Sequence, residues 1–176
     1  MRRFVIIAIS LLSCAFSYAQ GVSIPQLDRA SGKRVNFHYE YLLSKDGGDF
    51  SKVTEGDVLV EDNAYRLDGL GLTIVCDGKT RWMYDPSAGE VVIESAEQDN
   101  ILTNPALLIS SYRGYGNSLH VKSGTRDSLD VVYDVDDQVK ARFVLRDIIY
   151  EQQQGKSDFT FDVKSLPENT VVTDLR

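Results

Sequence analysis

The chain has 176 residues and a formal net charge of −7. This length suits a single domain with a substantial hydrophobic core. An acidic chain is repelled by nucleic acid and by anionic lipid surfaces, and no basic arm or arginine stripe is present, so we do not expect nucleic-acid binding.

The first residues have the pattern of a secretory leader. Met1, Arg2 and Arg3 are followed by an apolar run over residues 4–16, and small residues lie before Gln20. This pattern predicts a signal peptide over residues 1–19, one domain over residues 20–176 and a periplasmic location. The apolar run is shorter than the roughly 20 residues of a membrane span.

A second processing route remains open. Residues 11–14, Leu-Leu-Ser-Cys, have the outline of a lipobox, which would make Cys14 a lipidated first residue. We favour the free, soluble form. In that form Cys76 is the one remaining cysteine, and its apolar surroundings favour a buried, unreactive thiol.

The remaining elements are mostly strands. Residues 24–31 predict a short helix with Pro25 in its first turn, and residues 104–109 predict a second helix with Pro105 at its start. Turn residues at 46–48, 68–69, 77–78 and 85–89 separate segments of period two, typical of an antiparallel meander. Strands are predicted at 36–41, 58–60, 70–76, 80–84, 90–94, 119–121, 128–135, 140–150, 158–163 and 171–172.

The sequence contains no set of residues that is typical of a catalytic or metal site. His38 and His120 are the only histidines, and they do not have the spacing of a metal pair. Residues 134–137 lack the glycine and distal glutamate of a calcium loop and are typical of a hairpin turn. We therefore expect no enzyme, no metal and no cofactor.

Several segments, in order along the chain, resemble the LolA family of outer-membrane lipoprotein carriers. The first is Gly-Asp-Val-Leu-Val at residues 56–60, and the most specific is Ile-Val-Cys-Asp-Gly-Lys-Thr-Arg-Trp-Met-Tyr-Asp-Pro at 74–86. Residues 90–93, 104–109, 159–161 and 167–174 match weaker parts of the pattern. The resemblance implies a mainly β (α+β) fold, in which a curved antiparallel sheet forms an incomplete β-barrel with short helices as a lid.

The resemblance also implies a function. A carrier of this kind shields the acyl chains of lipoproteins in a hydrophobic cavity, receives them from an inner-membrane ABC transporter and passes them to an outer-membrane acceptor. We expect a monomer. Asp62 occupies the position where well-studied relatives have an arginine that helps to hold the lid, and Arg66 is the nearest alternative arginine.

Apolar and aromatic residues of the predicted strands and lid helix are the candidates for lipid contact, on the hypothesis that the strand residues share one face. The alternative is that they form an ordinary closed core. The candidates are Phe37, Tyr39, Tyr41, Val58, Val60, Leu67, Ile74, Trp82, Tyr84, Val91, Ile93, Leu107 and Leu108.

Two other functions fit the same fold. If Cys14 is lipidated, an outer-membrane lipoprotein acceptor becomes the better interpretation. A sensor of envelope stress that binds a lipid or a protein partner is the other alternative.

Overall fold

The computed structural model describes residues 23–96 and 100–176. The predicted leader, its cleavage site and Cys14 lie outside these residues. Among the residues described, no helix has both the length and the apolar character needed to cross a membrane.

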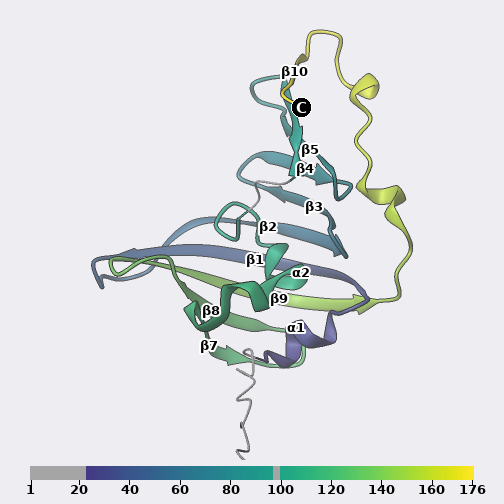
Figure 1. Ribbon diagram of the computed structural model, residues 1–176. Coiled ribbons are helices and arrows are strands. Elements are labelled where there is room, and N and C mark those ends of the chain that lie inside the picture. Colours follow the sequence, from purple (N-terminus) through teal and green to yellow (C-terminus); the bar gives the residue numbers. More distant parts are fainter. Residues whose placement is uncertain (1–22, 97–99) are drawn as a thin grey trace, which may run out of the picture.

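Ten strands form one open, curved sheet (Figure 1), in the order β10-β6-β5-β4-β3-β2-β1-β9-β8-β7. Neighbouring strands are antiparallel except β10 and β6, which are parallel. The elements in chain order are α1 (Pro25–Arg29), β1 (Arg34–Lys45), β2 (Ser51–Glu61), β3 (Ala64–Gly69), β4 (Leu72–Cys76), β5 (Thr80–Asp85), β6 (Glu90–Ser95), α2 (Leu107–Ser110), η2 (Tyr112–Ser118), β7 (Leu119–Gly124), β8 (Leu129–Asp134), β9 (Val139–Glu151), η3 (Lys156–Phe159), η4 (Val163–Ser165) and β10 (Val171–Asp174).

The mainly β fold with short helices is therefore confirmed, with two local corrections. Residues 64–69 form β3, which the sequence analysis did not identify, and the following turn lies at Leu70 and Gly71 rather than at residues 68–69. Residues 158–163 are not a strand. They leave the sheet as η3 and an extended stretch, because Phe159 packs on a face of the sheet instead of pairing with an edge.

The main core lies on the face of the sheet that carries Phe37, here called the inner face. The alternation of β1 places Val35, Phe37 and Tyr39 on this face, and all three are buried. Leu27 of α1 and Leu108 of α2 belong to the same core cluster. Helices α1 and α2 therefore cover the inner face (Figure 1).

Two glycines allow close packing around Tyr39. Tyr39 lies opposite Gly56, which lies opposite Gly69 on the next strand. A Cβ at Gly69 would lie 2.7 Å from the Tyr39 hydroxyl, and a Cβ at Gly56 would lie 2.1 Å from the carbonyl oxygen of Asp68. The Tyr39 hydroxyl thus occupies the space that a side chain at Gly69 would fill, and at Gly56 the backbone of β3 leaves no room for a side chain.

The opposite, outer face has a smaller core beneath the C-terminal segment, residues 152–170. Phe159 is fully buried there with Ala64 and Val75. In Figure 1 this segment runs beside the sheet from the end of β9 to β10.

A buried ion pair fixes the start of the C-terminal segment. Arg34 bonds to Asp158, lies 3.8 Å from Glu61 and is positioned over the ring of Phe159. Glu61 in turn accepts hydrogen bonds from the backbone N–H groups of Gln154 (3.0 Å) and Gly155 (2.9 Å). These groups join β1, β2 and the C-terminal segment.

Candidate functional site

A cleft of about 1300 Å³ opens between the helices and one end of the strands β2, β3 and β4. We call it the main cleft. Its apolar lining comes from α1, from the strand ends and from the covering segment, defined as residues 100–118 with α2 and η2. These apolar residues are Leu27, Ala30, Val60, Tyr65, Cys76, Ala96, Leu107, Ile109 and Tyr112.

The charged residues that line the main cleft have both signs. Asp28 and Asp62 contribute carboxylates, and Lys33, Lys79 and Arg113 contribute cations. A cleft with apolar walls and a few charged groups can hold the hydrocarbon part of an amphiphile while the polar part stays in water.

A cluster around Asp28 joins α1 to the covering segment. Its carboxylate accepts hydrogen bonds from Ser23 Oγ (2.6 Å), from the Tyr112 hydroxyl and from the Arg113 guanidinium. We call these four residues the Asp28 cluster. The hydrogen bonds from Ser23, Tyr112 and Arg113 lower the pKa of Asp28 from 3.8 to about 2. The hydrogen bonds to Tyr112 and Asp28 raise the pKa of Arg113.

This cluster holds the covering segment over the apolar lining. Tyr112 is buried, and so are Leu27, Val60, Tyr65 and Cys76 below it. Burial raises the pKa of the Tyr65 hydroxyl and of the Cys76 thiol. These buried residues are therefore shielded from water, and a ligand would reach them only after the covering segment moves, whereas Leu107 and Ile109 are partly exposed in the cleft.

Asp62 does not contribute to this closure. It lies in the turn between β2 and β3 with a φ of 54°, a conformation in which aspartate is favoured over most residues. Its carboxylate accepts a hydrogen bond from Gln153 Nε2 at 2.8 Å, in the C-terminal segment. Arg66 does not replace the family arginine, because it lies on the outer face and pairs with Asp68 at 2.8 Å.

The register divides the predicted lipid-contact residues between the two faces of the sheet. Those on the inner face or in the covering segment are Phe37, Tyr39, Tyr41, Val58, Val60, Leu67, Ile74, Leu107 and Leu108. Val60 and Leu107 are the two that line the main cleft. The others, apart from Ile74, are buried in the main core.

The remaining four, Trp82, Tyr84, Val91 and Ile93, lie on the outer face, so the hypothesis of one shared face is wrong for them. Residues directly opposite each other in antiparallel strands project to the same side. Trp82 pairs with Val75 and with Ile93, and Val75 belongs to the core beneath the C-terminal segment. Tyr84 pairs with Val91 and contacts Phe161 of that segment.

The sequence analysis did not identify several residues of the main cleft, although the alternation of two strands could have indicated Tyr65 and Cys76. Tyr65 lies two residues before Leu67, and Cys76 lies two residues after Ile74, so each continues an inner-face row to the end of its strand. Leu27 and Tyr112 had no such signal. They reach the cleft from segments that are far apart in sequence.

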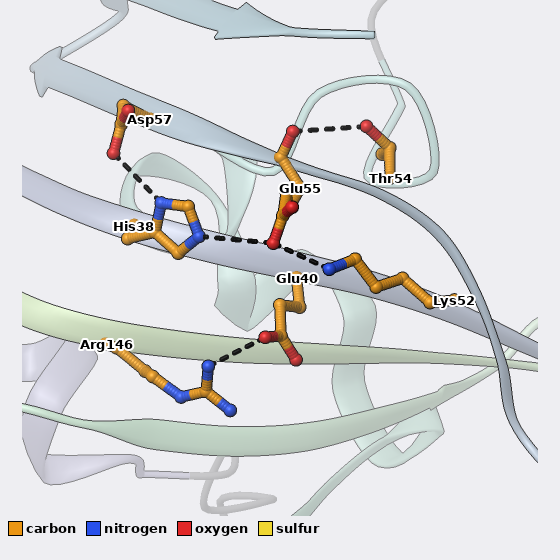
Figure 2. Close-up of polar contacts among 7 residues, drawn as sticks. All are labelled: His38, Glu40, Lys52, Thr54, Glu55, Asp57 and Arg146. Atoms are coloured by element: carbon orange, nitrogen blue, oxygen red, sulfur yellow. Dashed lines mark hydrogen bonds and ion pairs between the residues drawn. The ribbon is translucent and has the colours of Figure 1, made fainter.

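The outer face of β1 and β2 carries paired charges (Figure 2). His38 Nδ1 lies 3.0 Å from Asp57 and its Nε2 lies 3.8 Å from Glu55, which also bonds to Lys52 at 2.6 Å. Within residues 23–96 and 100–176, no group of three or more histidine, cysteine, aspartate or glutamate side chains could hold a metal ion. The second histidine, His120, is largely exposed and pairs with Asp134 at 2.8 Å.

The fold and the main cleft define a class of protein: a curved, open-sheet protein with helices over its inner face and a cleft beneath them. No family model matches the sequence. An outer-membrane lipoprotein carrier protein of Aliivibrio salmonicida is 25% identical over an alignment 177 residues long, which covers 92% of this chain and 86% of that protein. The chain is LolA-like, as its sequence motifs predicted. This relative is named as a carrier protein and not as an enzyme.

Two solved structures are similar at lower identity. A LolA superfamily protein from Nitrosomonas europaea has a TM-score of 0.49 and 10% identity, covering 78% of this chain and 96% of that one. An uncharacterised conserved protein from Thermus thermophilus has a TM-score of 0.46 and 9% identity, covering 85% and 94%.

Proposed function

We propose that this protein is a periplasmic carrier that shields the acyl chains of lipoproteins between the two membranes. The observation that carries the proposal is the main cleft, whose apolar lining lies beneath a covering segment held by a few polar contacts. Its volume of about 1300 Å³ exceeds the roughly 300–1000 Å³ usual for small-molecule pockets.

The energetics of transport suit such a cleft. Burial of one methylene is worth about 0.8 kcal/mol, so a long acyl chain represents on the order of 10 kcal/mol. A carrier must offset most of this cost while the chain is out of the bilayer, and it must still release the chain afterwards. A covering segment held by polar contacts meets both requirements, because cargo replaces the segment's own apolar contacts.

The partners follow from this role. The carrier would receive acylated lipoproteins from an inner-membrane ABC transporter and deliver them to an outer-membrane acceptor. We expect the protein to act as a monomer, after removal of residues 1–19.

A direct test uses a tryptophan reporter in the main cleft. Trp82 lies on the outer face, so its emission is expected to remain unchanged when cargo binds. The variant Leu107→Trp in a Trp82→Phe background places the reporter in the cleft lining. A synthetic triacylated cysteine peptide should shift the emission of this variant to shorter wavelength and saturate.

A pair of charge substitutions provides the control. Leu107→Glu places a carboxylate in the apolar lining and should weaken peptide binding, whereas Leu70→Glu changes an exposed turn residue and should not. Thermal unfolding of both variants checks that they fold. Equal binding by both variants, or no binding of any acylated peptide by the unmodified protein, would overturn the proposal.

In cells, depletion separates a carrier from a sensor. Lipoproteins should remain at the inner membrane when the protein is depleted. Correct sorting together with altered envelope signalling would instead indicate the sensor role.

A further inference from the structure

A second cleft, of about 680 Å³, lies beside α1 on the side of β9. We call it the basic cleft. Three cations line it: Arg29 and Lys33 from α1 and the turn after it, and Arg126 from the turn between β7 and β8. Asp127 is the one carboxylate among the lining residues. The cleft is therefore locally positive in a chain whose net charge is −7.

The two arginines of the basic cleft differ from the other described arginines in their ion pairing. Within residues 23–96 and 100–176, Arg29 and Arg126 are the only arginines without a carboxylate partner. Lys33, the third cation, also forms no ion pair with a residue in these ranges. In a protein with 26 acidic and 19 basic residues, unpaired arginines that line the same cleft leave their donors available for an external anion.

Contacts between α1 and the sheet bring Arg29 close to the turn that carries Arg126. Gln26 Nε2 donates to the carbonyl oxygen of Thr125 at 2.7 Å, and the Tyr150 hydroxyl donates to the carbonyl oxygen of Gln26 at 3.1 Å. The guanidinium of Arg29 lies 5.6 Å from the centre of the Tyr150 ring. Helix α1 is thus joined to the turn that carries Arg126.

The rest of the lining is apolar. Ile148, Ile149 and Tyr150 of β9 form one side, and Ile149 is 51% exposed. A free inorganic anion makes no use of such a surface, whereas an amphiphile does. We propose that the basic cleft binds the phosphate of a single anionic amphiphile, with Arg29 and Arg126 on the phosphate and Ile149 against its hydrocarbon part.

This inference does not depend on the proposed carrier function, because the two clefts have different linings. Among the residues that the structure describes, Lys33 alone lines both. An anionic membrane surface is a less suitable ligand than a single molecule, since the net negative charge of the protein opposes its approach to such a surface.

The test measures binding of dihexanoylphosphatidylglycerol below its micelle concentration by isothermal titration calorimetry. The double variant Arg29→Gln/Arg126→Gln should weaken binding about tenfold, a size expected for two exposed charge contacts. The matched control is Lys45→Gln/Lys122→Gln, which removes the same charge from exposed positions outside both clefts. It should leave the affinity almost unchanged.

Three results would overturn the proposal: no saturable binding, equal weakening in both double variants, or inorganic phosphate binding as tightly as the lipid. Binding to phosphatidylglycerol vesicles without binding to the short-chain lipid would also overturn it, in favour of a membrane surface site. The variant Leu107→Glu separates this proposal from the carrier function, because it should weaken binding of the triacylated peptide and leave phosphatidylglycerol binding intact.

Discussion

Substitution of Tyr112 by phenylalanine is expected to open the main cleft and to make Cys76 more reactive. The Tyr112 hydroxyl donates to Asp28 and so joins η2 to α1. Cys76 lies in the lining below, and its side chain is almost fully buried. The thiol is therefore a reporter of how often the covering segment moves away.

The size of the effect follows from the hydrogen bond that is lost. This hydrogen bond is partly buried. A net contribution of about 0.5–1.5 kcal/mol would mean that its removal raises the open population about 2- to 13-fold. The labelling rate follows this population when the segment opens and closes faster than the reagent reacts. The closed form reacts slowly also because burial raises the pKa of the Cys76 thiol above 9.0, which reduces the thiolate fraction.

The assay is reaction with a chromogenic disulfide reagent at pH 8 in a Cys14→Ser background, where Cys76 is the only thiol. Tyr84→Phe is the control, since it removes a tyrosine hydroxyl on the outer face. The triacylated peptide should protect Cys76. If Tyr112→Phe and Tyr84→Phe react at the same rate, with similar melting temperatures, the Asp28 cluster does not control access to the cleft.

Three further outcomes are expected. Phe159→Ala should lower the free energy of unfolding by about 3–5 kcal/mol in urea titrations, because the ring is fully buried. Phe161→Ala removes a partly exposed ring and should lower the free energy of unfolding by less. Equal losses in the two variants would contradict the packing described. Arg34→Met leaves the buried Glu61 without its cation and should cost about 3–5 kcal/mol, most of which the added substitution Glu61→Gln should restore. The carboxyl of Asp28 should titrate near pH 2 by NMR rather than at 3.8. Because its pKa is lowered on folding, its stabilising contribution is complete above pH 3.8 and is lost as the pH falls through 2.

Most strands were predictable because each has apolar residues at period two between clear turn signals. The alternation around Phe37 identified β1, and the helix with Pro25 in its first turn was also correct. Strand β3 was missed because Asp68 and Gly69 were interpreted as a turn, although Leu67 was among the predicted lipid-contact residues. The segment at Phe159 has a strand-like alternation, yet it packs on a face of the sheet instead of pairing with an edge.

The sequence by itself determined most strands of the sheet, most of its turns and its LolA-like character, because these depend on local periodicity and on motifs. Only the tertiary structure decided which face each strand presents. Trp82 and Ile93 alternate with their neighbours as regularly as Val58 and Val60 do, but the register of successive hairpins places them on the other side. Period two fixes the phase within one strand, whereas the face that is buried depends on pairing between strands and on the segments that cover them. The two clefts follow from the same cause, since each joins α1 to segments far away in the sequence.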